Sequence, residues 1–224
     1  LLSRGLGDVY KRQKLYNLKK VVYLQTSLCY GINPIKTSIS LTHPLFGGMY
    51  SGVSSYAISK TSGEQYLELS GQKFISLRLA NVYGPRNLSG PLPAFFYRLS
   101  NNMICNIVDS RRDFIFIDDV VDVIIKALTN AHTGYYHVST GKDFSIKELF
   151  DLVLKYMNLP DKINYNQLKL GKDDAPTILL DPSKTNNEFD WVAKTTLEEG
   201  VIKTIDWYKK NGLSEIFSHL KNIN

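Results

Sequence analysis

The chain has 224 residues and a formal net charge of +6, and hydrophobic residues make up 43% of it. This hydrophobic content excludes an intrinsically disordered protein, and the length allows one large domain or two small ones. No apolar run is long enough to cross a membrane, and the two cysteines lack metal-ligand spacing, so we expect a cytoplasmic protein. The positive charge favours an anionic partner, either nucleic acid or a phosphorylated small molecule. The basic residues are scattered rather than striped, which fits an ordinary surface equally well and gives nucleic acid little support.

The first thirteen residues have the character of a foreign segment. Residues 8–13 (DVYKRQ) resemble the translation of a transposon-end sequencing adapter, and we expect native sequence to begin near Lys14. The alternative is a genuine polar N-terminal segment. If the first interpretation is right, the chain is a truncated product that lacks whatever preceded Lys14.

Strands and helices are predicted to alternate along the chain. Short apolar runs predict strands at residues 21–27, 74–80, 114–117 and 135–139. Helices are expected at residues 54–71, 92–100, 120–131, 146–157 and 197–211, and irregular chain at 81–93 and 161–182. This alternation predicts βαβ units in a mainly parallel sheet, which binds ligands beyond the carboxyl ends of its strands.

Four Tyr–Lys pairs have a spacing of four residues: Tyr10/Lys14, Tyr16/Lys20, Tyr56/Lys60 and Tyr165/Lys169. On a helix this spacing places both side chains on one face, and a cation beside a phenol stabilises the phenolate that exchanges protons with a hydroxyl. Chance alone gives roughly one such pair, so the spacing has little value by itself. Only Tyr56/Lys60 lies on a predicted helix between two predicted strands, and Thr26 ends the first of these strands.

Five segments resemble, in the same order, motifs of the extended short-chain dehydrogenase/reductases, specifically the NAD-dependent nucleotide-sugar epimerase/dehydratase group. They are residues 24–31 (LQTSLCYG), 56–64 (YAISKTSGE), 78–86 (RLANVYGPR), 112–120 (RDFIFIDDV), and 181–185 (DPSKT) with 189–191 (FDW). The resemblance covers residues 21–208 and is greatest to UDP-glucose 4-epimerases. It implies an α/β fold, namely the C-terminal part of a Rossmann-type parallel sheet with a small substrate-binding subdomain.

The resemblance also implies roles at the active site. Thr26 would hydrogen-bond the reacting hydroxyl or ketone, Tyr56 would be the general acid and base, and Lys60 would bind the nicotinamide ribose of NAD and support Tyr56. Leu79 and Ala80 would lie near the nicotinamide. The mechanism that the resemblance implies requires no metal.

The implied substrate is a nucleotide-diphosphate sugar, and the implied assembly at full length is a homodimer. Thr26 would contact the sugar, while Asn81, Arg112 and Lys172 would hold the diphosphate, for which the paired donors of arginine are suited. Residues 14–84 with 113–144 would form a partial Rossmann domain. Residues 85–112 with 145–224 would form the substrate-binding subdomain.

The sequence departs from the family pattern at three places that bear on function. Related epimerases often have an Arg shortly before the Asp in the register of Asp174, whereas this chain has Lys172, which lacks the bidentate geometry of arginine. No Gly-rich phosphate loop follows a predicted strand, so we expect the chain as printed to bind NAD poorly or not at all. In 4,6-dehydratases of this family an Asp-Glu pair follows the Thr, whereas here Ser27 and Leu28 follow Thr26. Leucine transfers no proton, so 4,6-dehydration is disfavoured.

Epimerisation of a nucleotide sugar is therefore the expected activity, and two alternatives stay open. One is a keto-sugar reductase or dehydrogenase of the same family, and the other is a non-catalytic nucleotide- or RNA-binding module.

Several polar residues also have purely structural interpretations. Glu64 is expected to form an exposed ion pair with Lys60. Asp118 and Asp119 are expected to cap a helix rather than bind metal, and His137 is expected to be structural.

Overall fold

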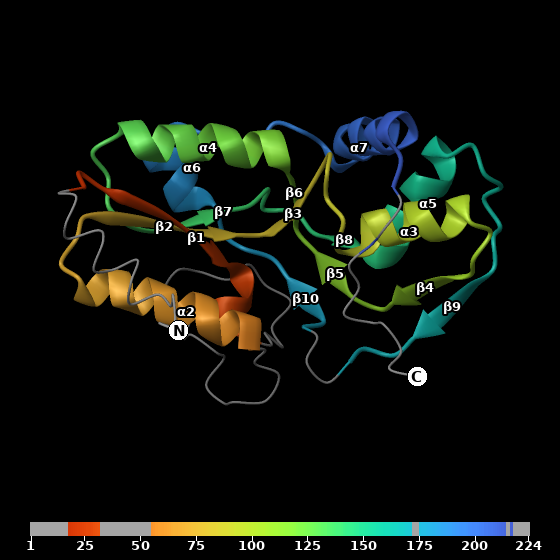
Figure 1. Cartoon of the computed structure of the whole chain (residues 1–224), viewed down its shortest axis with the longest axis horizontal. Coiled ribbons are helices and arrows are strands. Elements are labelled where there is room, and N and C mark those ends of the chain that lie inside the picture. Colours follow the sequence, from red (N-terminus) through yellow and green to blue (C-terminus); the bar gives the residue numbers. More distant parts are fainter. Residues whose placement is uncertain (1–17, 32–54, 172–174, 214–215, 217–224) are drawn as a thin grey trace, which may run out of the picture.

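The computed structural model describes residues 18–31, 55–171, 175–213 and 216, and a three-stranded parallel sheet forms the centre of one lobe (Figure 1). Its strands, in the order β1-β2-β7, are β1 (Val21–Thr26), β2 (Phe74–Leu79) and β7 (Gly134–Val138). Helix α2 (Ser55–Leu69) covers one face, and α4 (Ile117–Thr129) with α6 (Ser183–Phe189) covers the other. The predicted α/β class with parallel strands is therefore confirmed.

Within the described residues, the second lobe contains three helices and two small sheets. The helices are α3 (Pro91–Ser100), α5 (Ile146–Tyr156) and α7 (Leu197–Asn211). Strand β4 (Cys105–Val108) pairs in parallel with β9 (Tyr165–Leu168), while β5 (Arg111–Arg112) lies between β10 (Thr177–Ile178) and β8 (Phe144–Ser145). The parallel pair of β3 (Asn81–Tyr83) and β6 (Phe114–Phe116) lies between the two lobes in Figure 1.

Two hydrophobic clusters form the core of the part of the chain that the structure describes. One lies around the central sheet and includes Ile75, Leu77 and Val138, together with Leu180 and Trp191 from the C-terminal part of the chain. The other fills the second lobe with residues of α3, α5 and α7. The division into the two discontinuous domains named above stays a prediction.

Tyr83 shows how closely α7 packs against β3. Its hydroxyl donates to the carbonyl of Leu197 at 3.2 Å. A Cβ atom added at Gly200 would lie 2.0 Å from the Tyr83 hydroxyl oxygen and 2.9 Å from Phe116 Cδ2, so only glycine fits at this crossing. The aromatic residue of the Asn-Val-Tyr-Gly segment is thus a packing residue between the lobes.

The sequence-based boundaries of the long helices and of the central strands hold to within a few residues, but the irregular segments contain more structure than expected. Residues 81–93 include β3 and the first turn of α3, and residues 161–182 include β9 and β10. Strands of two to four residues are too short to show a period-2 pattern, and most of β9 is polar and exposed, so the sequence carries no signal for them. Among the described residues, no helix combines the length and apolar character needed to span a lipid bilayer.

Candidate active site

The carboxyl ends of β1 and β2 lie side by side, and this edge faces the second lobe in Figure 1. Thr26 is in register with Leu79, and Leu79 is in register with Val138 of β7. Ala80 follows and is buried, with its backbone N–H donating to the carbonyl of Val138 at 2.9 Å. Three of the residues predicted to form the site therefore lie at the edge where parallel sheets bind their ligands.

Thr26 ends β1 and caps the 3-10 helix η1 (Ser27–Tyr30) that follows it. Its side-chain oxygen accepts a hydrogen bond from the backbone N–H of Leu28 at 3.2 Å. This contact uses an acceptor lone pair and leaves the hydroxyl proton to be donated elsewhere. The hydroxyl of Thr26 is thereby oriented by the backbone while keeping its capacity as a donor.

Tyr56 and Lys60 lie on α2, which connects β1 to β2 and packs against both β1 and η1. Because this helix runs back from the carboxyl ends of the strands, its first turn, which contains Tyr56, lies at the same end of the sheet as η1 (Figure 1). The side chain of Tyr56 is about half exposed (51%), so a ligand can reach its hydroxyl.

Lys60 is attached to β1 through its side chain. Its Nζ donates to the carbonyl of Leu24, two residues before Thr26, at 3.0 Å. This bond holds the ammonium beside the strand that ends in Thr26. Lys60 of α2 thus contacts the strand that ends in Thr26.

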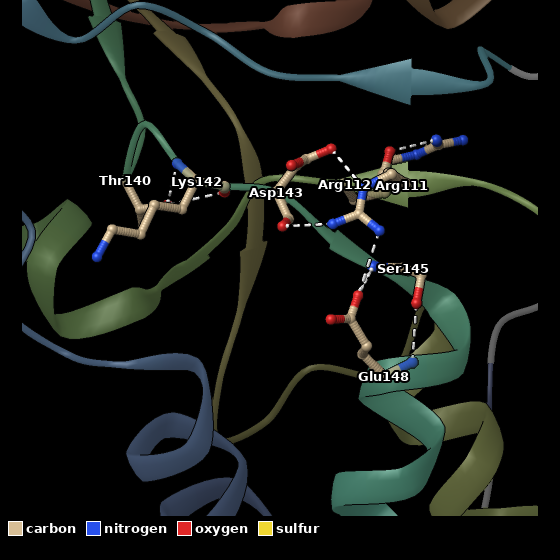
Figure 2. A network of polar contacts seen from close by, with 7 residues as sticks. All are labelled: Arg111, Arg112, Thr140, Lys142, Asp143, Ser145 and Glu148. Carbon is tan, nitrogen blue, oxygen red and sulfur yellow. Dashed lines mark hydrogen bonds and ion pairs between the residues drawn. The ribbon is translucent and has the colours of Figure 1, made fainter. Parts of the chain in front are cut away.

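Two of the three residues predicted to hold the diphosphate lie on strands of different sheets, Asn81 on β3 and Arg112 on β5. The backbone N–H of Asn81 donates to the carbonyl of Asp113 at 2.9 Å, and Arg112 directly precedes Asp113. Arg111 is bound by carboxylates instead, with Nε 2.7 Å from Asp143 Oδ2 and Nη1 3.3 Å from Glu148 Oε2. Figure 2 shows the guanidinium of Arg112 pointing away from both of these carboxylates. Lys172, the third predicted residue, lies outside the described residues.

Glu64 overturns the expectation of an exposed ion pair with Lys60. It is buried and pairs with Arg78 of β2 through two contacts, Nη2–Oε1 at 2.7 Å and Nε–Oε2 at 3.2 Å. Ser76 also donates its hydroxyl to Glu64. Burial opposes the charge of Arg78, but its hydrogen bonds to Glu64 raise its pKa above the ordinary value. An arginine inside an apolar strand is the signal that could have predicted a buried acidic partner.

The same arginine continues the network towards β7. Arg78 Nη1 donates to the hydroxyl of Tyr30 at 2.8 Å, and this hydroxyl lies 2.6 Å from Nε2 of His137. The other ring nitrogen, Nδ1, lies 3.0 Å from the carbonyl of Asp181, which can only accept. Nδ1 therefore carries a proton, and because burial lowers the pKa of His137 to about 4, the ring is neutral at pH 7 and Nε2 accepts from Tyr30. The prediction that His137 is structural agrees with this placement.

Asp119 has a structural role that differs from the predicted helix cap. Asp118 and Asp119 lie in the first turn of α4, but the N-cap residue is Phe116 and no side chain caps the helix. The carboxylate of Asp119 accepts instead from the backbone N–H groups of Lys194 and Thr195, both at 3.1 Å. In the part of the chain that the structure describes, no cluster of His, Cys, Asp and Glu could hold a metal ion.

Asp113 is a third buried carboxylate, one that the sequence did not single out. It accepts from the Thr140 hydroxyl at 2.7 Å, and from the backbone N–H groups of Thr140 and Gly141 at 3.1 and 3.2 Å. Burial nevertheless raises its pKa to about 6. These hydrogen bonds connect the loop after β7 to the chain segment directly after Arg112.

His137 and Asp113 are expected to give opposite contributions to the pH dependence of stability. Burial lowers the pKa of His137 from 6.5 to about 4, so only the unfolded chain binds this proton between those values, and stability is lost as the pH falls. The pKa of Asp113 is raised from 3.8 to about 6, so the folded chain binds this proton first, and stability is lost as the pH rises.

We therefore expect urea unfolding at pH 7, 6, 5 and 4.5 to separate two variants. The stability advantage of the wild type over His137→Gln should shrink with falling pH, towards a total change of about 3 kcal/mol. The advantage over Asp113→Asn should grow over the same range. Differences that stay constant with pH would contradict these assignments.

Comparison with known proteins was made on the sequence and on the fold. The model of the NAD dependent epimerase/dehydratase family matches residues 5–141. A CDP-abequose synthase from Salmonella muenchen is 32% identical over 203 residues, which cover 82% of this chain and 68% of that relative.

Two solved structures from Bordetella bronchiseptica have closely similar folds. The enzyme WbmH in complex with NAD+ is 43% identical with a TM-score of 0.83, covering 92% of this chain and 67% of that one. The enzyme WbmG in complex with NAD and UDP is 39% identical with a TM-score of 0.85, covering 96% and 68%. The chain thus spans about two thirds of the length of these relatives. The Rossmann-type fold and the predicted family are confirmed, and the chain belongs to the NAD dependent epimerase/dehydratase family.

Proposed function

We propose that the protein catalyses the NAD-dependent epimerisation of a nucleotide-diphosphate sugar at C4, with Tyr56 as the acid and base. One observation carries the proposal: α2 presents Tyr56 and Lys60 four residues apart, and Lys60 is hydrogen-bonded to the strand that ends in Thr26. A non-catalytic binding module has no need for these three side chains together.

The residues at this edge suit the nicotinamide-ribose end of NAD. An ammonium has three protons, so Lys60 keeps two for ribose hydroxyls after donating one to Leu24. Leu79 and Ala80 offer an apolar surface to a nicotinamide ring at the end of β2. When bound, NAD supplies a hydride acceptor and donor for C4 of the sugar.

Side chains of the protein would transfer the proton of the C4 hydroxyl and hydrogen-bond its oxygen. Tyr56 takes the proton of the C4 hydroxyl as this carbon is oxidised, and gives it back when the hydroxyl is formed again in the inverted configuration. The Thr26 hydroxyl donates a hydrogen bond to the same oxygen, in both its hydroxyl and ketone forms. A positioned acid and base of this kind contributes about 10²- to 10⁴-fold to the rate.

The diphosphate of the substrate is assigned to Asn81, Arg112 and Lys172. The presence of UDP in the WbmG complex supports a nucleotide diphosphate as the substrate class. Ser27 and Leu28 lie in η1, where a 4,6-dehydratase would need an acid and a base, which favours epimerisation over elimination. We further propose that the enzyme is a cytoplasmic homodimer.

The test is a product assay on the longest protein that the parent gene encodes, because the printed sequence contains no Gly-rich phosphate loop. UDP-glucose, UDP-galactose and their N-acetyl forms are incubated separately with the protein and NAD, and the sugars are resolved by chromatography. Interconversion of a C4-epimer pair is the expected result. Consumption of a keto-sugar with NADH and no inversion would favour the reductase alternative, and salt-dependent RNA affinity without turnover would favour a binding module.

A further inference from the structure

Tyr23 contacts Lys60 at two points from the middle of β1. Its hydroxyl donates to the backbone carbonyl of Lys60 at 2.8 Å, and its ring centroid lies 5.5 Å from the Lys60 ammonium. Burial raises the pKa of Tyr23 above its ordinary value, so the phenol stays protonated and acts as the donor. Strand β1 therefore holds Lys60 at both ends, through Tyr23 at its backbone and through Leu24 at its ammonium.

Gly63 makes room for this arrangement. It lies one turn after Lys60 on α2, and a Cβ atom added there would be 2.4 Å from the Tyr23 hydroxyl oxygen and 3.0 Å from its Cζ. A side chain at Gly63 would push the phenol away from the Lys60 carbonyl. The small residue on the helix and the tyrosine on the strand are thus parts of one contact.

The contact restrains a side chain that is otherwise mobile. A free lysine side chain has about 2 kcal/mol of rotamer entropy, and losing this freedom on ligand binding weakens the binding free energy. Because Tyr23 fixes the backbone of Lys60 and lies beside its ammonium, part of this entropy is lost on folding rather than on ligand binding. The two ammonium protons not given to Leu24 are then presented in a set direction.

We propose that Tyr23 is a positioning residue for Lys60, and that Gly63 is required for it to act. The proposal rests on the proposed function, because it assigns Lys60 to the ribose of a nicotinamide dinucleotide. It adds a specific claim: the hydroxyl and the ring of Tyr23 set the affinity for NAD.

Three variants of the full-length protein test the proposal: Tyr23→Phe, Gly63→Ala and the control Tyr135→Phe. Tyr135 is also a half-buried tyrosine of the central sheet, on β7 rather than β1. Loss of the Tyr23 hydroxyl should raise the Kd for NAD about tenfold, the equivalent of one hydrogen bond. The KM for NAD should rise by the same factor, and kcat should change less than KM. Gly63→Ala should reproduce both effects, and Tyr135→Phe should produce neither.

A double variant separates positioning from simple loss of stability. In a Tyr23→Leu background there is no phenol to displace, so Gly63→Ala should cause no further loss of NAD affinity. Equal effects of Gly63→Ala in both backgrounds would overturn the proposal. So would a Tyr23→Phe variant that matches the wild type in NAD affinity and differs only in melting temperature. NAD affinity is measured without a sugar, so it reports on positioning even if the sugar assay fails, whereas a wild type that binds no NAD refutes the proposed function itself.

Discussion

Replacing Tyr56 by phenylalanine is expected to lower kcat for sugar epimerisation by about 10²- to 10⁴-fold, because it removes the hydroxyl that exchanges the C4 proton in the proposed mechanism. The side chain is about half exposed, so the free energy of unfolding should change by less than about 0.5 kcal/mol. Initial rates with the interconverted sugar pair and a urea titration measure the two quantities. The combination of lost turnover and retained stability is what distinguishes a catalytic group from a packing group.

Tyr66→Phe is the matched control for this experiment. Tyr66 lies on the same helix and has the same exposed fraction, 51%, but it lies almost three turns further from the end of the sheet that carries Thr26. Its replacement should leave kcat within about twofold of the wild type. Turnover retained by Tyr56→Phe, or an equal loss in both variants, would remove Tyr56 from the mechanism.

Glu64→Gln is expected to have the largest effect on stability, a loss of about 3 to 5 kcal/mol, because it leaves the charge of Arg78 buried without its partner. Arg78 reaches only Glu64 among carboxylates in the described ion pairs, and the side chains of both are less than a tenth exposed. The free energy of unfolding from urea titration, measured by circular dichroism, gives the value.

The control is an exposed ion pair, Lys147–Asp151, whose side chains are 42% and 50% exposed. Asp151→Asn should cost no more than about 0.5 kcal/mol. In a double-mutant cycle, Glu64→Leu with Arg78→Met should be more stable than either single variant, since no unpaired charge remains. A Glu64→Gln variant as stable as Asp151→Asn would show that Arg78 is satisfied by other groups.

The sequence was sufficient to predict the parts of the site that depend on topology. Four Tyr–Lys pairs have the same spacing, and Tyr56/Lys60 was selected because it lies on a predicted helix between two predicted strands. The structure places this pair on α2, between β1 and β2 in the chain. Tyr165 lies on the strand β9 instead, and Tyr10 and Tyr16 lie outside the described residues. The alternation of β1, α2 and β2 was predictable because the two strands are apolar runs of six residues and the helix between them has fifteen.

Contacts between distant residues could not be predicted in the same way. The i,i+4 spacing of Lys60 and Glu64 suggested a local pair, but Glu64 faces the sheet and Lys60 reaches the strand backbone. The bond of Tyr23 to the Lys60 carbonyl crosses from strand to helix, and spacing carries no information about such a crossing. Asp119 likewise binds backbone groups that are more than seventy residues away in sequence.

The most direct test of transient oxidation at C4 is to follow a deuterium label through the sugar assay. A nucleotide sugar carrying deuterium at C4 is converted by the full-length protein with NAD, and the epimer is analysed by mass spectrometry and NMR. Transient oxidation at C4 predicts an inverted product that keeps the deuterium at the same carbon, because the hydride that leaves C4 returns to it. An inverted product that carries solvent hydrogen at C4, or no inverted product from any sugar tested, would contradict epimerisation by transient oxidation at C4.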